Sequence, residues 1–289
     1  MLLCLQDGKL SPPPPEDFAF ILQRFCKERN PIHVLHLHAY MMKNGLETDA
    51  SSGNHLVSML SKIGRLTEAQ SIFDGLDLRD EMSWSSLITG YVKENIFQKA
   101  LALYEEMDMN VPVCMSSVTL VALLKASAKL KDPEKGFKIH LVASKSGLLE
   151  IDPFVGTTLV DMYAKCGFLD EAQKVLYILR VRDVVSWTAL ISGYAEYGHG
   201  KKAIDCFEKM QLESISPNVV TYICLLKACT SIGDLTKGEE IHAEAHRNGM
   251  LERHSFLGSA LVDMYAKCGS IALAQQMFDK ILVRDTVSW

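Results

Sequence analysis

A stretch of nine residues occurs twice in this chain, and it constrains the fold more than any other feature. Leu159–Gly167 and Leu261–Gly269 both read LVDMYAKCG, with 102 positions between their first residues (261 − 159). The phrase Arg-Asp-x-x-Ser-Trp occurs three times and ends at Trp84, Trp187 and Trp289. Because identity at a fixed separation marks a chain built by internal repetition, the fold is expected to be an array of similar units.

The long period divides again into units of about 31, 35 and 36 residues. We place them at 15–49, 50–80, 81–116, 117–152, 153–183, 184–218, 219–254 and 255–285, with a truncated unit at 286–289. Residues 1–14 run into the prolines Pro12–Pro15, which are unsuited to a helix interior, so they are expected to be a disordered leader. The units are predicted to form a single solenoid over residues 15–289.

Each unit has the pattern of two amphipathic helices joined by a turn. In the unit 255–285, a first helix is expected near Phe256–Lys267, and Gly269 supplies the left-handed residue that commonly follows a helix end. A second helix is expected near Ile271–Ile281. In second helices a small residue stands four before a large one, which lets helices approach and fills the groove between them: Ala69/Phe73, Ala100/Tyr104, Ala172/Leu176, Ala203/Phe207 and Ala274/Phe278.

A single hairpin of this kind cannot bury both of its apolar faces, whereas stacked hairpins can. No segment shows the alternation of a strand. The sequence therefore predicts an all-α fold, a right-handed α-solenoid of stacked helix-turn-helix repeats, similar to the tetratricopeptide superhelix. The composition suits a buried core, with 48% hydrophobic and 22% charged residues.

The bulk properties point to no membrane or secretory role. The opening MLLCLQD is too short an apolar run for a secretion signal, and it is not an Arg- and Ser-rich transit leader. The longest uncharged stretch, Met109–Leu124, falls short of a membrane span. The eight cysteines form no C-x-x-C pair, so we expect packing residues in a reducing compartment. A net charge of −5 does not indicate a nucleic-acid binder, although a basic strip can lie within an acidic total.

One face of the first helices carries small or charged polar residues. Positions 5, 9 and 13 of each unit, counted from its first residue, lie four apart and share a face. They read Asn54/Ser58/Lys62, Ser85/Thr89/Lys93, Val121/Lys125/Lys129, Thr157/Asp161/Lys165, Thr188/Ser192/Glu196, Ile223/Lys227/Ser231 and Ser259/Asp263/Lys267. This stripe is either a solvated face with ordinary i,i+4 ion pairs or a ligand-binding ribbon. Asn, Ser and Thr are poor helix formers, so their recurrence at position 5 favours a ribbon.

With these motifs the chain resembles the pentatricopeptide-repeat family of plant organelle RNA-binding proteins over residues 15–289. The alternation of about 35, 36 and 31 residues looks like the P, L and S units of its PLS subclass. LVDMYAKCG and RDVVSW are close to the S-unit consensus and the S-to-P junction, while Val184–Asn218 looks like a P unit and Val219–His254 like an L unit. The resemblance implies binding of single-stranded RNA, one base per repeat, read on the Watson–Crick edge. It also implies a mitochondrial or chloroplast location and a role in RNA processing or C-to-U editing-site selection.

The resemblance further implies which residues contact RNA. The reader pair of a unit is its position-5 residue with its last residue: Asn54 with Asp80, Thr157 with Asp183, Thr188 with Asn218 and Ser259 with Asp285, for which the family's code gives U, G, A and G. Ser85 pairs with either Met115 or Ser116, and the L-like units, with Val121 and Ile223 at position 5, receive no base. Position-2 residues would sandwich the bases: Met82, Val118, Phe154, Val185, Val220 and Phe256. Position-13 lysines would lie toward the phosphates: Lys62, Lys93, Lys129, Lys165 and Lys267.

Catalysis is not expected. His242-x-Glu244 matches half of the zinc deaminase signature, but no C-x-x-C follows it. His242 and His246 are four apart without the H-E-x-x-H order of a metalloprotease. The tryptophans are expected in the core. Proteins of the PLS subclass often end in E and DYW domains, the latter deaminase-like, and this chain is expected to be a fragment or short reading frame without them. An editing or processing enzyme would then act in trans. No cofactor, metal, membrane or DNA is expected as a partner.

A peptide-binding scaffold of the tetratricopeptide type is the alternative function. Trp187-x-x-Leu190 and Gly193-Tyr194 faintly match that family's pattern. Its period is a steady 34 residues, however, whereas this chain cycles through three lengths. A positive groove would favour RNA, and a groove with hydrophobic pockets would favour a peptide.

Overall fold

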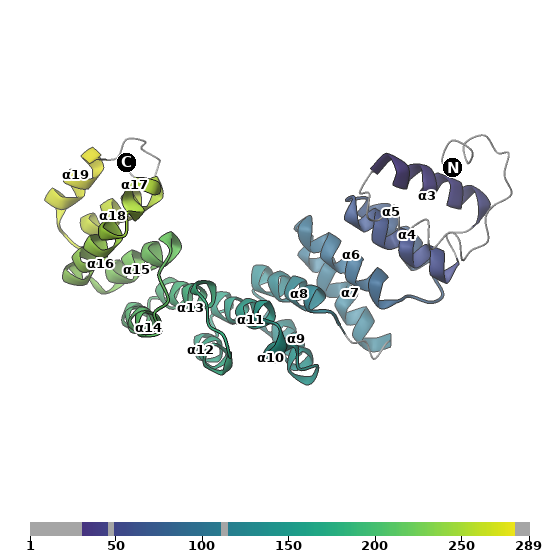
Figure 1. The fold of residues 1–289 in the computed structure, drawn as a ribbon, viewed down its shortest axis with the longest axis horizontal. Helices are drawn as coiled ribbons and strands as arrows, with labels where there is room; N and C mark the ends of the chain where they lie inside the picture. The colour runs from purple at the N-terminus through teal and green to yellow at the C-terminus, as the bar shows by residue number, and fades with distance from the viewer. Residues whose placement is uncertain (1–30, 46–48, 111–114, 281–289) are drawn as a thin grey trace. The chain divides into compact units, whose positions relative to one another are not determined.

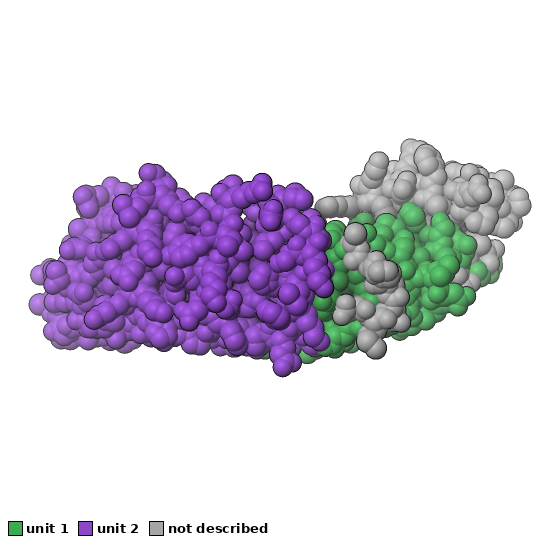
Figure 2. All heavy atoms as spheres, turned by 90° about the horizontal axis from the view of Figure 1, so that it is seen from below, with its two compact units in different colours: residues 1–130 green, residues 131–289 purple. Residues whose placement is uncertain are grey.

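The computed structural model describes residues 31–45, 49–110 and 115–280. The described residues form α-helices joined by short turns and contain no strand. The chain divides into two compact units, residues 1–130 and 131–289, which Figure 2 colours separately. No helix among the described residues is long and apolar enough to cross a membrane.

Unit 1 contains two complete helical hairpins and parts of two others (Figure 1). Its first helices pack side by side, α4 against α6 and α6 against α8, and α4 and α6 also pack against the second helices of their own hairpins, α5 and α7. The helices are α3 (Pro31–Asn44), α4 (Ala50–Lys62), α5 (Leu66–Asp74), α6 (Glu81–Lys93), α7 (Phe97–Asn110) and α8 (Ser117–Leu130).

Unit 2 repeats the same arrangement. The first helices α11, α13, α15 and α18 pack in sequence, and each packs against its own second helix. The helices are α9 (Pro133–Lys145), α10 (Leu148–Ile151), α11 (Pro153–Lys165), α12 (Leu169–Ile178), α13 (Val184–Glu196), α14 (Gly200–Leu212), α15 (Val219–Ile232), α16 (Leu235–Arg247), α17 (Met250–Arg253), α18 (Ser255–Lys267) and α19 (Ile271–Lys280). The prediction of an all-α repeat solenoid is confirmed.

A helix begins at each place where the sequence suggested a new unit. The residues 50, 81, 117, 153, 184, 219 and 255 are each the first residue of a helix. Gly269 has φ +86° and follows α18, as expected. The leader 1–14, the start of the unit 15–49, Ile281 and the segment 286–289 lie outside the described residues, so the single array over 15–289 stays a prediction.

The three unit lengths have a structural cause in the second half of each hairpin. The 31-residue units have second helices of 9 or 10 residues, α5, α12 and α19, whereas α7, α9, α14 and α16 have 13 or 14. Two of the three 36-residue units, 117–152 and 219–254, add a four-residue helix, α10 or α17, whereas part of the corresponding segment of 81–116 lies outside the described residues. Each added helix follows a left-handed glycine, Gly147 (φ +71°) or Gly249 (φ +64°).

Four of the five small–large pairs of the second helices lie in the core, as predicted. Ala69, Ala100, Ala172 and Ala203 are fully buried, and so are their partners Phe73, Tyr104, Leu176 and Phe207 to within 2% of their surface. In the fifth pair Ala274 is buried but Phe278 is only half-buried. Trp84 and Trp187 are also buried, which confirms their expected core position, while Trp289 lies outside the described residues.

The Met and the Tyr of the repeated nonapeptide contact the second helix of the preceding unit. Met162 lies so close to Gly136 that a Cβ there would come within 2.4 Å of its sulfur, and Met264 approaches Gly238 in the same way at 2.6 Å. The Tyr163 hydroxyl bonds to His140 Nδ1 at 2.9 Å, and Tyr265 to His242 at 2.8 Å. The Met and the Tyr of both segments thus contact the same residue types, a glycine and a histidine, on the second helix of the preceding unit. These contacts give a structural reason for the recurrence of Met and Tyr at these positions.

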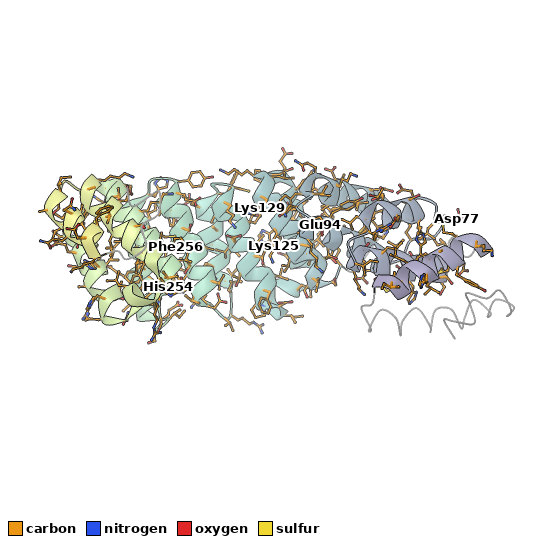
Figure 3. All side chains as sticks on the ribbon, turned by 90° about the horizontal axis from the view of Figure 1, so that it is seen from above. Asp77, Glu94, Lys125, Lys129, His254 and Phe256 are labelled. Atoms are coloured by element: carbon orange, nitrogen blue, oxygen red, sulfur yellow. The ribbon has the colours of Figure 1, made fainter. Side chains whose placement is uncertain are left out.

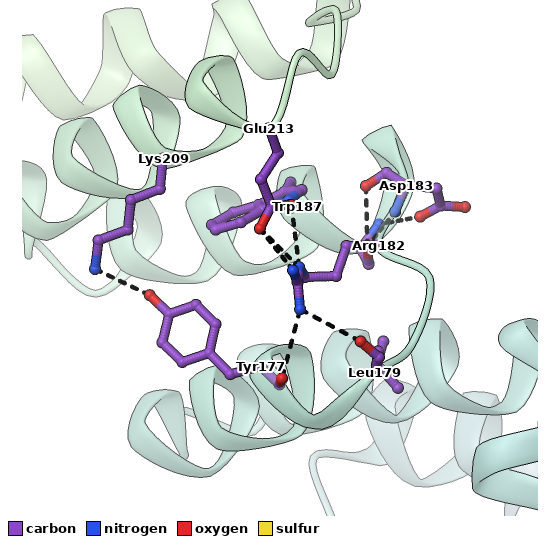
Figure 4. A network of polar contacts seen from close by, with 8 residues as sticks. Tyr177, Leu179, Arg182, Asp183, Trp187, Lys209 and Glu213 are labelled. Carbon is purple, nitrogen blue, oxygen red and sulfur yellow. Dashed lines mark hydrogen bonds and ion pairs between the residues drawn. The ribbon is translucent and has the colours of Figure 1, made fainter.

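The Arg-Asp-x-x-Ser-Trp phrase builds the junction between two hairpins (Figure 4). The Arg182 guanidinium donates to Glu213 at 2.9 Å and to the carbonyls of Tyr177 and Leu179. Asp183 and Ser186 form a reciprocal capping box at the start of α13. The buried Trp187 donates its Nε1–H to Glu213 Oε2 at 3.0 Å. The phrase therefore encodes a turn, a helix start and a core anchor.

Candidate nucleic-acid interface

The last residues of three units, Asp80, Asp183 and Asn218, are predicted to read a base, and each is also the N-cap of the next helix. The side-chain Oδ1 atom accepts a backbone N–H of the third helical residue in three units: Asp80 from Ser83 at 2.8 Å, Asp183 from Ser186 at 2.8 Å and Asn218 from Thr221 at 3.0 Å. The bond satisfies a donor that the helix leaves unpaired. One side-chain atom is thereby committed inward, and the other, Oδ2 in Asp or Nδ2 in Asn, is left for a ligand.

The position-5 residue of the unit 50–80 is held by its own hairpin. The Asn54 amide donates to the carbonyls of Ala50 at 2.6 Å and Leu78 at 2.9 Å, and its Oδ1 accepts the backbone N–H of Asp80 at 3.2 Å. Only 4% of Asn54 is exposed. One lone pair of Oδ1 is all that remains for a base.

Two other position-5 residues are tied to their last-residue partners through a threonine. The Thr188 hydroxyl lies 2.7 Å from the Thr221 hydroxyl, which donates to Asn218 Oδ1 at 3.1 Å. In unit 1, the Ser85 hydroxyl accepts from Thr119 Oγ1 at 2.7 Å, and Thr119 lies 2.9 Å from Ser116 Oγ. Ser116 immediately precedes α8, so the geometry favours Ser85 with Ser116 as the reader pair.

The remaining predicted readers have plainer surroundings. Thr157 is half-buried, and its hydroxyl makes no hydrogen bond with any residue that the structure describes. Ser259 is buried, with 4% of its surface exposed. Asp285 lies outside the described residues.

The position-2 side chains are mostly exposed apolar groups. Five of the six predicted sandwich residues are exposed by half or more, although apolar side chains of this size are usually buried: Val118 67%, Phe154 76%, Val185 54%, Val220 50% and Phe256 69%. Met82 is half-buried. Figure 3 labels Phe256 beside His254 at the start of α18. These side chains take no part in the packing of the hydrophobic core, so their surface is open to a ligand.

The position-13 lysines divide into two groups. Lys165 pairs with Asp161 at 2.6 Å and Lys267 with Asp263 at 2.7 Å, each within its own helix. The alternative of ordinary i,i+4 ion pairs therefore holds for these two. Lys62, Lys93 and Lys129 are exposed and have no ion pair with any described residue. Figure 3 labels Lys129, with Lys125 one turn before it on α8.

A hollow of about 420 Å³ in unit 1 collects residues of all three predicted kinds. It is lined by the reader Ser85, the sandwich residue Val118, and the lysines Lys62, Lys93 and Lys125, together with Ser61, Ser86, Thr89, Gly90, Val92, Val121 and Ala122. Its charged lining is entirely cationic, and its volume lies within the range of about 300–1,000 Å³ typical of ligand pockets. Val92, Val118, Val121 and Ala122 give it apolar walls as well.

Sequence reasoning assigned no role to three residues of this region. Lys125 at position 9 lines the hollow, and the buried Thr119 and Thr221 at position 3 contact the readers. The capping-box pattern was the available signal, because the third helical residue faces back to the N-cap.

His242, Glu244 and Cys206 pack within the repeat. Burial lowers the pKa of His242, which bonds to Tyr265, and raises the pKa of Cys206 to about 12. Glu244 accepts from Gln211 at 3.0 Å and from Tyr222 at 3.1 Å. No group of three His, Cys, Asp or Glu residues that could hold a metal occurs in the described ranges.

Comparison with known proteins identifies the repeat. A model of the PPR repeat matches residues 82–110, 157–184 and 220–250, and a model of the PPR repeat family matches 182–231. The chloroplastic pentatricopeptide repeat-containing protein At4g18520 of Arabidopsis thaliana is 34% identical over 277 residues, 95% of this chain and 44% of its own length. The chain belongs to the pentatricopeptide-repeat family. The mitochondrial At1g06140 of the same plant is 33% identical over 88% of this chain and 45% of its own length.

Solved structures of the family share the fold. The crystal structure of the pentatricopeptide repeat protein PPR10 in complex with an 18-nt psaJ RNA element superposes with a TM-score of 0.71 at 17% identity. The match covers 89% of this chain and 38% of PPR10. The crystal structure of PPR10 from maize superposes over the whole chain with a TM-score of 0.62. This pentatricopeptide-repeat chain spans less than half the length of the relatives it matches.

Proposed function

We propose that this pentatricopeptide-repeat chain binds single-stranded RNA in a sequence-selective manner, with one base at each repeat. The observation that carries the proposal is a pattern along the first helices. An exposed apolar side chain at position 2 lies beside a polar reader pair, and this arrangement recurs from unit to unit. An apolar or aromatic side chain can stack on any base, which supplies affinity without selectivity. Polar groups at the base edge then supply the selectivity. The RNA complex of PPR10, which has the same fold, supports this role.

The cap geometry gives a physical reason for the bases that the resemblance implies. In Asp183, capping commits Oδ1, so Oδ2 faces the ligand as an acceptor, which suits the N1–H and N2–H donors of guanine. In Asn218, capping commits the oxygen, so Nδ2 faces the ligand as a donor, which suits the N1 acceptor of adenine. The remaining lone pair of Asn54 Oδ1 suits the N3–H of uracil. The order U, G and A for the units 50–80, 153–183 and 184–218 is thus chemically consistent.

The cationic hollow favours a polyanion over a peptide. Lys62, Lys93 and Lys125 line the hollow without any acidic neighbour among its lining residues. Ammonium groups beside a base-sized apolar wall can hold a phosphate while the base rests on Val118. A hydrophobic pocket for a peptide side chain would gain nothing from three lysines.

We further propose that the protein works in an organelle, as a PLS-type protein, in RNA processing or C-to-U editing-site selection. The relatives' names place them in chloroplasts or mitochondria, which supports the location. Recognition would be this chain's contribution, and the chemistry would come from an enzyme acting in trans.

Selection of a randomised RNA pool against the purified chain tests base-by-base recognition. We expect enrichment of a motif in which U, G and A occur at the spacing of their repeats. Enrichment of no motif, with binding that depends on RNA length alone, would reject sequence selectivity.

Replacement of Lys62, Lys93 and Lys125 with Gln tests the phosphate contacts. Each contact to a single strand contributes about 0.7 to the slope of log affinity against log salt, so the slope should fall by about 2. The matched control replaces three exposed lysines of second helices, Lys43, Lys138 and Lys201, and should leave the slope unchanged. Equal effects of the two triple variants would show that net charge, and not the hollow, governs binding.

A further inference from the structure

Two buried threonines at position 3 of their helices connect the members of a reader pair. Thr221 in α15 and Thr119 in α8 expose none of their surface, so neither can touch a ligand. Thr221 lies between Thr188 and Asn218, and Thr119 lies between Ser85 and Ser116. Each threonine therefore acts on a ligand only through the two readers beside it.

The direction of the hydrogen bonds around Thr221 follows from counting protons. Asn218 must present its oxygen to α15, because it accepts the backbone N–H of Thr221 at 3.0 Å. The Thr221 hydroxyl therefore donates its single proton to that oxygen, and it also accepts the Asn218 backbone N–H at 3.2 Å. The 2.7 Å contact with Thr188 must then be a donation from Thr188 to Thr221.

This direction fixes what the unit 184–218 offers a base. The Thr188 hydroxyl donates its only proton to Thr221, so it can offer a ligand lone pairs only and acts as an acceptor. Asn218 faces the ligand with Nδ2, as a donor. An acceptor beside a donor complements a base edge with an amino group next to a ring nitrogen, the edge of adenine and of cytosine.

The direction in unit 1 is the opposite. Thr119 donates its proton to Ser85 at 2.7 Å, so the 2.9 Å contact between Ser116 and Thr119 must be a donation from Ser116. Ser85 keeps its own proton and faces the ligand as a donor. Ser116 has spent its proton and faces the ligand with a lone pair. A donor beside an acceptor complements a carbonyl next to a ring N–H, the edge of guanine and of uracil.

We propose that Thr119 and Thr221 are positioning residues that set the donor and acceptor order of the reader pairs, so that the unit 81–116 selects G or U and the unit 184–218 selects A or C. The proposal rests on the proposed function and deepens it by adding a third position to the reading of a base. Position 3 does not act in this way in every unit. Ser186, the equivalent residue of α13, bonds back only to the backbone of Asp183 and does not contact Thr157.

The connection is tested without RNA by a double-mutant cycle on thermal unfolding. The variants are Thr188→Val, Thr221→Val and the double variant, each of which keeps the β-branched shape. Because the two hydroxyls bond to each other, we expect the double variant to lose less stability than the sum of the single losses. Strict additivity would overturn the connection.

The reading role is tested with pairs of RNAs that differ at one base. For Thr221→Val, we expect the preference for A over G at the base of the unit 184–218 to fall about two- to tenfold, the worth of one hydrogen bond. Thr221→Ser, which keeps the hydroxyl, should preserve the preference. Thr119→Val should weaken only the preference for G or U at the base of the unit 81–116. Ser186→Ala is the matched control and should not change the base preference of the unit 153–183.

The outcomes separate the two ideas. If wild-type protein distinguishes no bases, the proposed function fails and the reading role with it, while the cycle still reports on the hydroxyl contact. If wild-type protein distinguishes bases and Thr221→Val keeps the full preference, the proposed function stands and the role of Thr221 is refuted. Preference of the unit 81–116 for A or C would refute the proton order at Ser85.

Discussion

Replacing Asp183 separates the stability of the repeat from the reading of a base, because this side chain caps α13 and is predicted to read guanine. Its Oδ1 accepts Ser186 N–H at 2.8 Å. Asp234 caps α16 in the same way, accepting Lys237 N–H at 2.9 Å, but it lies between the two helices of a hairpin and is not a predicted reader. Asp183→Asn and Asp183→Ala can therefore be compared with Asp234→Asn and Asp234→Ala.

The expected stability changes follow from capping alone. Asn caps about as well as Asp, so both Asn variants should unfold within about 0.5 kcal/mol of the wild type. Ala removes the cap, so both Ala variants should lose about 1 kcal/mol, or roughly 2–4 °C in melting temperature for an array of this size.

The expected binding changes differ between the two sites. Asp183→Asn keeps the inward oxygen and replaces the outward acceptor with a donor. A donor facing the N1–H of guanine should cost about 1–3 kcal/mol, or about five- to 150-fold in affinity, and should shift the preference from G to A. Asp183→Ala should lose the preference without gaining another, and neither Asp234 variant should change it.

Affinities for two RNAs that differ only at this base, measured beside thermal unfolding, decide the matter. If Asp183→Asn retains the preference for G, the outward atom does not read the base. If Asp234→Ala changes base preference as much as Asp183→Ala does, the binding effect of Asp183 is only a consequence of a weakened helix start.

Three further predictions concern the surface, the junction and the packing. Phe154→Ala should weaken RNA binding by about 1–3 kcal/mol for any base and leave stability unchanged, since Phe154 is exposed, whereas Phe137→Ala on a second helix should not affect affinity in a binding titration. Hydrogen bonding by Arg182 lowers the pKa of Glu213, so the stabilisation by Glu213 is present at neutral pH and is lost as the pH falls through the lowered pKa. Glu213→Gln should therefore unfold at a lower temperature than the wild type at pH 7, and the difference should shrink as the carboxylate becomes protonated in acid. Gly200→Ala places a Cβ 2.5 Å from the Ala228 carbonyl and should cost about 1–3 kcal/mol in denaturant unfolding, while an unchanged midpoint would show that α14 can shift away.

The fold could be predicted from the sequence because the units pack in the same way, so the residues that make the packing contacts recur along the chain. The nonapeptide fixes one set of contacts, such as Met162 on Gly136, and its recurrence as Met264 on Gly238 shows the period directly. Helix starts were equally accessible, since Asp and Asn before an apolar run are strong caps. The second helix expected near Ile271–Ile281 begins at Ile271, as α19 does.

The binding surface was harder to predict from the sequence than the fold, because its properties depend on distances between helices. The ion pairs of Lys165 and Lys267 were visible in the sequence, since each lysine has an aspartate one turn earlier on its own helix. The hollow that brings Lys62, Lys93 and Lys125 together from three helices was not. The hydroxyl contacts of Thr119 and Thr221 depend on how closely two first helices approach. No residue pattern within one unit specifies that spacing, because the partner belongs to the next unit.

If the last residue of a unit reads a base as proposed, its role as a helix cap would let such an array vary its sequence preference without losing its fold. The last residue of a unit must start the next helix, so it is drawn from the few good caps, and Asp and Asn among them differ only in the atom that faces outward. Exchanging Asp183 for Asn should then change a base contact while the inward bond stays the same. The two L-like units, for which no reader pair is predicted, differ at this position: His254 makes no side-chain cap bond, whereas Asp152 still accepts the Phe154 N–H at 2.9 Å. A cap can therefore be present without a predicted reader pair, so capping limits which residues can serve as readers but does not by itself identify a reader.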